Sequence, residues 1–236
     1  MTGTLINVGA VLAGTLLGLS AGSRLTERLQ QRVLAGLGMV TLVIGVDLAL
    51  AWSREDTTRH TPLYVLGAIL LGGLLGEAAD LEGRLERLGH RLQRRFARGD
   101  EHSTLSEGFV TASLLFCVGS LAVVGSIQDG LNGDFQLLAT KATLDGFAAV
   151  ALAASLGWGV ALSVVPVLVY QGAITLGAGA VDDILRGEAL AALTSAGGIT
   201  IIGISLKLLE VKDVRVANYL PALVIAPALV GLGRLL

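Results

Sequence analysis

A lysine and an aspartate stand four residues apart inside an apolar segment of the chain. Lys141 and Asp145 belong to the run KATLDGF, several residues from the nearest end of the segment 136–157. Residues four apart share one face of a helix, so the ammonium and the carboxylate can meet. An ionisable group within a membrane span costs about 2.5–3.5 kcal/mol on insertion scales, which makes it a functional candidate. The pair is either a structural salt bridge or a titratable pair that a proton, a cation or an anion breaks during transport.

Two more polar candidates follow the preceding apolar segment. Gln128 and Asp129 lie in the run 125–134, which contains three glycines, two carboxylates and no basic residue. One interpretation of this run is an outer loop. The other is a break in the helix, or a vestibule that concentrates cations.

Four further polar residues are candidates because apolar segments surround them. Gln171 follows Pro166; a buried glutamine needs hydrogen-bond partners, and the proline frees a backbone carbonyl nearby. Asp47 lies about one turn from the expected outer end of its segment, where exposure to the membrane interface is the simpler interpretation. Asn7 and Asn218 complete the candidates for a transport pathway or an ion-binding site.

The composition indicates what surrounds these residues. Of the 236 residues, 53% are hydrophobic and 15% are charged, whereas a soluble domain has about 25% charged residues. Too few polar residues remain to cover a water-soluble globule, so we expect a membrane protein. The net charge of −2 argues against a nucleic-acid-binding protein, and the single cysteine excludes an intrachain disulfide.

Eight segments are long and apolar enough to cross about 30 Å of hydrocarbon. They are 5–22, 33–52, 63–79, 108–126, 136–157, 160–180, 190–209 and 217–234. With the N-terminus outside, most of the 17 Lys and Arg residues fall in the inner connections, as the charge rule for membrane proteins requires. The sequence therefore predicts an all-α, polytopic membrane helix bundle with both termini outside.

An internal repeat predicts how the spans are arranged. Thr41–Leu50 (TLVIGVDLAL) matches Ile199–Leu208 (ITIIGISLKL) at a fixed offset. Spans one to three would recur as spans six to eight, and an odd number of crossings between them makes the copies inverted, as in many secondary transporters. The expected parts are a first repeat at 1–79, a central insertion with the charged pair at 108–157, and a second, inverted repeat at 160–236. Rows of glycines, such as Gly14, Gly18 and Gly22, favour close helix packing within the bundle or dimerisation.

The connection 80–107 has a pattern of its own. Leucines and a phenylalanine recur every three or four residues from Leu81 to Phe96, and arginines occupy the other face. This pattern is typical of a basic amphipathic helix on the cytoplasmic leaflet. The alternative is a helix that binds a partner protein.

Sequence motifs for common enzyme classes are missing. The chain has no G-x-x-x-x-G-K-[ST] loop and no H-E-x-x-H, and its three histidines lie in expected connections. We therefore expect no enzymatic activity and no cofactor, and the sequence assigns no metal.

Four stretches of the sequence resemble one known family. They read GTLINVGAVLAGTLLG, SEGFVTASLLFCVGSLAVVGSIQDGLNGD, KATLDGFAAVALAASLGWGV and NYLPALVIAP. Over nearly its whole length the chain is similar to the bacterial inner-membrane family known as domain of unknown function 554, the YqgA/YdfK-like proteins. The resemblance implies a multi-pass protein of the bacterial inner membrane, without an assigned substrate. The family's motif residues correspond here to Gly125, Ser126, Asp129, Gly130, Lys141, Asp145, Gly146, Gln171, Gly172, Asn218 and Pro221.

Taken together, these features predict a secondary transporter or channel for a small solute or ion across the bacterial inner membrane. The alternative is a non-transporting scaffold or sensor subunit that binds a partner through the basic helix within 80–107. The expected partners are the lipid bilayer and an unidentified solute or ion, without nucleic acid. A homo-oligomer is compatible with the glycine rows.

Overall fold

The computed structural model describes residues 1–22, 26–53, 57–96, 104–117, 120–180 and 185–233, which are helical with short connections. No β-strand occurs within these ranges. The predicted all-α class is therefore confirmed for the described part of the chain. Helices suit this composition because a helix satisfies its own backbone hydrogen bonds, which lipid cannot do.

The chain divides into two compact units. Unit 1 consists of Met1–Leu37, Gly83–Cys117 and Leu121–Ala178. Unit 2 consists of Gly38–Glu82, Val118–Ser120 and Gly179–Leu236. Helix α2 (Glu27–Ala49) therefore contributes its first turns to unit 1 and the remainder to unit 2. The expected division into two repeats and an insertion stays a prediction.

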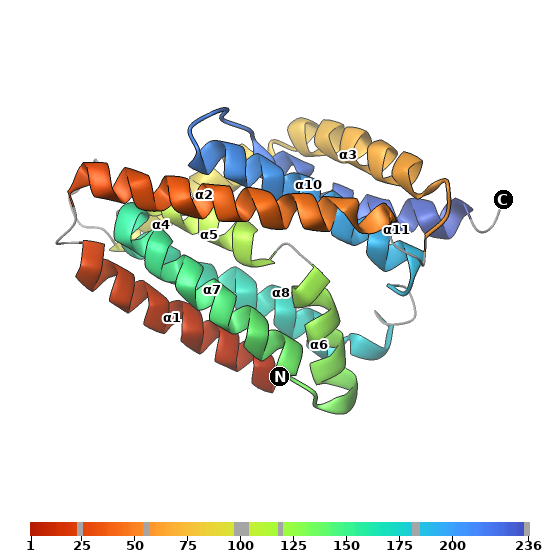
Figure 1. Cartoon of the computed structure of the whole chain (residues 1–236), viewed down its shortest axis with the longest axis horizontal. Helices are drawn as coiled ribbons and strands as arrows, with labels where there is room; N and C mark the ends of the chain where they lie inside the picture. The colour runs from red at the N-terminus through yellow and green to blue at the C-terminus, as the bar shows by residue number, and fades with distance from the viewer. Residues whose placement is uncertain (23–25, 54–56, 97–103, 118–119, 181–184, 234–236) are drawn as a thin grey trace. The chain divides into compact units, whose positions relative to one another are not determined.

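In unit 1, helix α1 (Thr2–Gly22) packs closely along helix α7 (Gln136–Leu156), and Figure 1 shows the two side by side. A Cβ atom added at Gly14, Gly18 or Gly22 would meet the carbonyl oxygen of Gly146, Val150 or Ala154, respectively. These contacts advance in the same direction on both helices, so α1 and α7 run parallel. The predicted glycine row of the first span thus serves packing within the bundle.

The segment Gln136–Leu176 reverses direction. It contains α7, the 3-10 helix η2 (Gly157–Ser163) and helix α8 (Val164–Leu176). A straight helix of its 41 residues would be roughly 60 Å long. However, Leu138 contacts Gly3, and Gly172 faces the side chain of Met1, so both ends of the segment lie at the N-terminal end of α1. The reversal occurs at η2, whose first residue is a glycine with a φ of +76°, a backbone conformation that glycine adopts readily.

Helix α5 (Leu105–Cys117) and helix α6 (Ser120–Asn132) replace the expected single span 108–126. Because α6 continues to Asn132, the outer-loop interpretation of residues 125–134 is wrong for most of that run. A Cβ atom at Gly125 would meet the side chain of Leu138, and one at Gly130 would meet the carbonyl oxygen of Thr175. Close packing within unit 1, rather than a turn, explains these two glycines.

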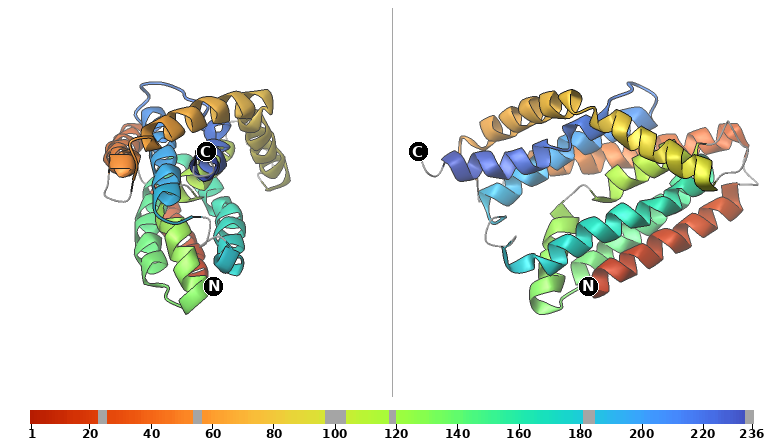
Figure 2. Two further views of the ribbon diagram at one scale, coloured as in Figure 1. Left: turned by 90° about the vertical axis from the view of Figure 1, so that its right-hand side faces the viewer. Right: turned by 180° about the vertical axis from the view of Figure 1, so that it is seen from behind.

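Unit 2 contains two antiparallel helix pairs. One pairs α2 with α10 (Glu188–Leu208): Gly38 contacts Leu209, Gly45 contacts Ile202, and Gly198 contacts Ala49. The other pairs α3 (Thr61–Ala78) with α11 (Ala222–Gly233): Gly72 contacts Ala222, and Gly233 contacts Tyr64. Short 3-10 helices, η1 (Leu50–Ser53) and η3 (Val216–Tyr219), precede α3 and α11. The chain of unit 2 can be followed from behind in Figure 2.

Six helical segments are long and apolar enough to cross a membrane, or up to seven if α5 and α6, which differ in direction by 61°, form one span. The six are Thr2–Gly22, Arg28–Ser53, Thr61–Ala78, Gln136–Leu176, Glu188–Leu208 and Val216–Gly233. Large apolar side chains on these helices are exposed, for example Leu16, Leu74 and Phe147 at 69%, 69% and 74%. Such exposure suits contact with lipid. A polytopic membrane helix bundle is thus supported, while the predicted count of eight spans stays a prediction.

The connection 80–107 contains helix α4 (Leu81–Phe96), as the sequence pattern predicts. The side chains of Arg84, Arg87 and Arg91 are exposed, whereas Leu81 and Leu85 are half-buried. Residues 97–103 of this connection lie outside the described residues. Attachment of α4 to the cytoplasmic leaflet stays a prediction.

Candidate functional site

Lys141 and Asp145 form a buried ion pair in unit 1. The Lys141 ammonium contacts Oδ2 of Asp145, and the two residues are only 5% and 8% exposed. Asn7 of α1 donates a hydrogen bond from Nδ2 to the same carboxylate oxygen, over 3.0 Å. The sequence therefore predicted both the pair and its i,i+4 geometry, and the structure adds Asn7 as the third member.

The close packing of α1 on α7 brings Asn7 within reach of the pair. Asn7 and Gly14 are two turns apart on α1, and both are buried against α7. An asparagine side chain is short, so it reaches a carboxylate on a neighbouring helix only where the two backbones approach closely. Glycines provide that approach.

Several buried polar atoms in unit 1 have no hydrogen-bond partner. Among the described residues, the buried side-chain atoms without a partner are Thr4 Oγ1, Asn7 Oδ1, Thr15 Oγ1, Ser126 Oγ, Gln171 Nε2, Gln171 Oε1 and Thr175 Oγ1. We refer to these residues as the unpaired set. All of them belong to unit 1, on helices α1, α6 and α8. A buried donor or acceptor that stays unpaired costs about 1–3 kcal/mol, so such groups usually bind water or a ligand.

Gln171 is the clearest member of the unpaired set. Its side chain is fully buried, and neither its amide nitrogen nor its amide oxygen has a partner in the described structure. It lies in a buried stripe of α8 together with Val167 and Thr175, which are four residues away on either side. An amide can donate two hydrogen bonds and accept two, so Gln171 offers a complete set of unused interactions inside unit 1.

Contacts near one end of unit 1 place most of these polar groups at a common level. Asp129 of α6 bonds to Gly3 at the start of α1, and Gly130 packs on the carbonyl of Thr175. Leu138, near the start of α7, also contacts Gly3. Polar side chains lie within about one turn of these contacts on every helix: Thr4 and Asn7 on α1, Ser126 on α6, Lys141 on α7 and Gln171 on α8. The ion pair and four members of the unpaired set, Thr4, Asn7, Ser126 and Gln171, therefore lie near one level, which we call the polar layer of unit 1. Thr15, about two turns beyond Asn7 on α1, lies outside this layer.

Asp129 acts as a cap for α1. Its Oδ2 accepts a hydrogen bond from the backbone N–H of Gly3 over 3.0 Å and lies 2.9 Å from the α-amino nitrogen of Met1. A carboxylate at a helix N-terminus satisfies an unpaired N–H group and interacts favourably with the helix dipole. Gln128 beside it is half-buried. The structure thus gives Asp129 a definite structural role at the edge of the polar layer.

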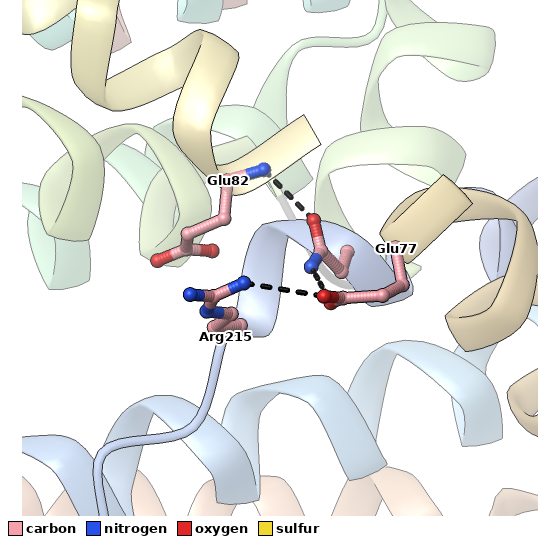
Figure 3. A network of polar contacts seen from close by, with 4 residues as sticks. Glu77, Glu82 and Arg215 are labelled. Carbon is pink, nitrogen blue, oxygen red and sulfur yellow. Dashed lines mark hydrogen bonds and ion pairs between the residues drawn. The ribbon is translucent and has the colours of Figure 1, made fainter. Parts of the chain in front are cut away.

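The other two sequence candidates belong to unit 2. Asp47 is exposed on α2, in agreement with the simpler interpretation of its position. Asn218 is buried in η3, where its Oδ1 accepts the N–H of Glu82 over 2.8 Å and its Nδ2 donates to Glu77 over 2.6 Å (Figure 3). Arg215 pairs with the same Glu77 carboxylate over 3.2 Å. The amide of Asn218 is therefore fully engaged in a network that joins α3, α4 and η3.

Two buried glutamates were missed by sequence reasoning. Glu82 accepts a hydrogen bond from the backbone N–H of Ala217 over 2.7 Å. Glu188 accepts hydrogen bonds from Thr58 and from Thr61 at the start of α3, the latter over 2.6 Å. Both lie at helix starts, beside the apolar segments rather than inside them, and a search restricted to charges within spans passes over them. No group of three or more His, Cys, Asp and Glu side chains in the described structure could hold a metal ion.

Comparison with known proteins identifies one matching family model and two relatives of similar length. Residues 2–231 match the family model "Protein of unknown function (DUF554)". The chain is 30% identical over 230 residues to "Uncharacterized membrane protein YdfK" of Bacillus subtilis (strain 168), covering 98% of this chain and 96% of that protein. It is also 30% identical over 227 residues to "Uncharacterized protein YqgA" of Escherichia coli (strain K12), covering 95% and 94%. No solved structure matches the chain.

The family model and the Bacillus subtilis relative bear on two predictions from the sequence, which are membership of this family and location in a membrane. The match extends over nearly the whole chain, so both units and the polar layer lie within the shared region. The printed name of the Bacillus subtilis relative describes a membrane protein. The chain therefore belongs to the DUF554 family of membrane proteins.

Proposed function

We propose that the protein is a small secondary transporter or channel that moves a small solute or ion across the bacterial inner membrane. The proposed pathway passes through the polar layer of unit 1, with Lys141 and Asp145 at its centre. The observation that supports this function most directly is the fully buried Gln171, whose amide atoms have no partner.

The energetic argument is that a structural core would not retain this arrangement. A buried ion pair is often no more stable than apolar residues of the same volume. Each unpaired polar atom adds a cost of about 1–3 kcal/mol. These free-energy costs are offset when a polar species enters the layer and pairs with the unpaired atoms. A transported solute is such a species.

The helix directions also support a transporter built from inverted repeats. In unit 2, α2 is antiparallel to α10, and α3 is antiparallel to α11. In unit 1, α8 runs against α7 and therefore against α1. Each helix of the expected triplet α1–α2–α3 thus runs opposite to the corresponding helix of the triplet α8–α10–α11, as inverted repeats require. Counting α7 and α8 as separate spans, and α5 with α6 as one, gives the proposed eight crossings.

Transport is tested with the purified protein in vesicles of phosphatidylethanolamine and phosphatidylglycerol. Uptake is measured for labelled alkali cations, halides, amino acids, sugars and polyols, against empty vesicles. For the transported compound, we expect Asp145→Asn and Lys141→Met to lower the flux about tenfold or more. The matched controls Asp213→Asn and Lys212→Met change exposed residues of unit 2 and should leave the flux unchanged.

Single charge removal can also unfold the protein, because it leaves a buried charge without a partner at a cost of about 3–5 kcal/mol. The double variant Lys141→Met/Asp145→Asn removes both charges and avoids that cost. We expect this variant to fold like the wild type, as judged by its elution from a size-exclusion column, and to be inactive. Wild-type flux equal to that of empty vesicles for every compound, or full flux in the double variant, would refute the proposal.

A scaffold or sensor subunit remains the second candidate, because α4 presents exposed arginines at Arg84, Arg87 and Arg91. In this case α4 would bind a partner protein or an anionic lipid surface. Changing the three arginines to glutamine should then abolish association with the partner in a pull-down from the native membrane, while transport is absent. If the same variant transports normally, the scaffold function is excluded as the sole role.

The proposed environment follows from the same features. The bilayer is the main partner of the exposed apolar side chains, and the protein is a multi-pass protein of the inner membrane. We propose neither enzymatic activity nor nucleic-acid binding. A homo-oligomer is compatible with this function but is not needed for it, because the polar layer is formed by one chain.

A further inference from the structure

We propose that the polar layer of unit 1 binds a small zwitterion, a solute with one ammonium and one carboxylate group and no net charge. The zwitterion opens the ion pair between Lys141 and Asp145 and pairs with both residues. This inference rests on the proposed transport function and adds to it the chemical class of the solute.

The charge balance of the site is the first argument. Inside the layer lie one buried ammonium and one buried carboxylate, and Asn7 donates to the same oxygen of that carboxylate. The buried Asp129 at the edge of the layer is already paired with the α-amino group of Met1. A lone cation that bound Asp145 would leave Lys141 unpaired, and a lone anion that bound Lys141 would leave Asp145 unpaired. Either case costs about 3–5 kcal/mol for the charge that is left. A zwitterion replaces one ion pair by two, so no charge is left without a partner.

The position of the two charges is the second argument. Lys141 and Asp145 lie one turn apart on the same face of α7, and the lysine side chain is long, with a flexible four-carbon stem. Both existing contacts of Asp145 use Oδ2, which leaves Oδ1 for a third donor. The ammonium group of the solute can therefore bind Asp145 while Asn7 stays in place.

The unpaired set is the third argument. Once the charges are matched, the rest of a small polar solute needs neutral donors and acceptors. Gln171 supplies both types from its free amide, and Asn7 supplies a free Oδ1. The hydroxyl groups of Thr4 and Ser126 can donate or accept. Neutral partners of this kind bind the solute without adding a net charge to the layer.

A divalent metal ion fits the layer less well. Calcium is usually bound by six to eight oxygen ligands, several of them carboxylates. The polar layer holds one carboxylate that is already paired with an ammonium, and the described residues contain no group of three or more His, Cys, Asp and Glu that could bind a metal. The arrangement favours a zwitterionic solute instead.

The only cysteine of the chain provides a direct reporter of binding. Cys117 of α5 is half-buried, and α5 packs against α7, the helix that carries Lys141 and Asp145. A solute bound at the ion pair should slow the alkylation of Cys117 by N-ethylmaleimide in the detergent-solubilised protein. The compounds are glycine, alanine and glycine betaine as zwitterions, methylammonium as the cation, acetate as the anion, and urea as the neutral compound.

Variants of Lys141 and Asp145 test which charged groups the solute must carry. In the wild type we expect one or more of the zwitterions to slow alkylation at least about tenfold, and methylammonium and acetate to have no effect. Asp145→Asn leaves only the ammonium and should change the preference to acetate. Lys141→Met leaves only the carboxylate and should change it to methylammonium. The exposed control Lys212→Met should keep the wild-type preference.

Uptake into vesicles supplies the second measurement. Because a zwitterion has no net charge, its uptake through the wild type should be independent of a membrane potential imposed with potassium and valinomycin. Protection and uptake by methylammonium or acetate alone, or an unchanged preference in both charge variants, would overturn the inference and leave the transport function intact. No flux of any compound would instead overturn the transport function itself.

Discussion

The packing of α1 on α7 can be tested with a pair of substitutions on one helix. Gly14 and Gly9 are five residues apart on α1, and each can be changed to alanine. A Cβ atom at Gly14 would overlap the carbonyl oxygen of Gly146 and would lie 3.1 Å from the Cβ atom of Ala149. A Cβ atom at Gly9 meets nothing within 4 Å. The two variants add the same methyl group, but only one adds it at a helix contact.

The expected magnitude follows from this comparison. Both changes gain similar helix propensity, up to about 1 kcal/mol, so the difference between the variants isolates the packing. Overpacking of a tight contact costs about 1–3 kcal/mol. We therefore expect the unfolding equilibrium constant of Gly14→Ala to exceed that of Gly9→Ala by about 5- to 150-fold.

A second effect of Gly14→Ala concerns the site. Relief of the overlap requires the two backbones to separate by roughly 1 Å. Donor–acceptor distances of N–H···O hydrogen bonds vary over only about 0.5 Å. The bond from Asn7 to Asp145 is 3.0 Å long, so it would lengthen beyond a favourable distance. Gly14→Ala should consequently lower transport, whereas Gly9→Ala should not.

The assay is reversible unfolding in mixed micelles with increasing dodecyl sulfate, followed by the fluorescence of Trp158 in η2 of unit 1. The variant Trp52→Phe removes the other tryptophan of the chain and serves as the background. Equal stability of the Gly14→Ala and Gly9→Ala proteins would refute the parallel, glycine-mediated packing of α1 on α7. This holds whether both variants keep the stability of the wild type or lose it to the same extent.

The remaining predictions concern polar groups. Gln171→Leu removes an unpaired amide and should raise the unfolding free energy by about 1–3 kcal/mol while abolishing flux; a less stable variant would show that the amide has partners. Glu82→Gln weakens the bond to the N–H of Ala217 and should cost about 1–2 kcal/mol in the same unfolding assay, whereas the exposed Glu86→Gln should be neutral. Asp129→Ala removes the cap of α1 and should cost about 1 kcal/mol, visible as faster hydrogen exchange in the first turn of that helix.

Sequence reasoning identified the ion pair, Asn7 and Gln171, but neither their grouping nor the buried threonines of the unpaired set. Lys141 and Asp145 are recognisable because an i,i+4 spacing is a local property of one helix. The contact of Asn7 with Asp145 joins residues 138 positions apart, and no local pattern specifies which partner a span selects. The glycine row beginning at Gly14 contained part of this information, since it identified the face of α1 that packs closely, although not the helix against which it packs.

The misinterpreted run 125–134 shows why glycine is ambiguous in membrane proteins. In a soluble protein, repeated glycines beside aspartates indicate turns, because glycine tolerates unusual backbone angles. In α6, Gly125 and Gly130 are helical and allow the close approach of α7 and α8. Whether a glycine forms a turn or a close helix contact depends on the segment packed beside it, and the local sequence does not show which segment that is. Within the run 125–134, only Gly133, with a φ of +69°, has the backbone conformation of a turn glycine.

The contrast between the two units supports the proposed location of the site in unit 1. In unit 2, Ser195 accepts a bond from the N–H of Trp52, Ser205 donates to the carbonyl of Gly38, and Asn218 uses both ends of its amide. These groups stabilise the unit, because each joins two elements and is satisfied in doing so. In unit 1, the described residues include buried side-chain atoms of similar chemistry that join nothing. Both units come from one chain under one requirement for stability, so the unsatisfied groups of unit 1 support the proposal that a polar species enters the layer.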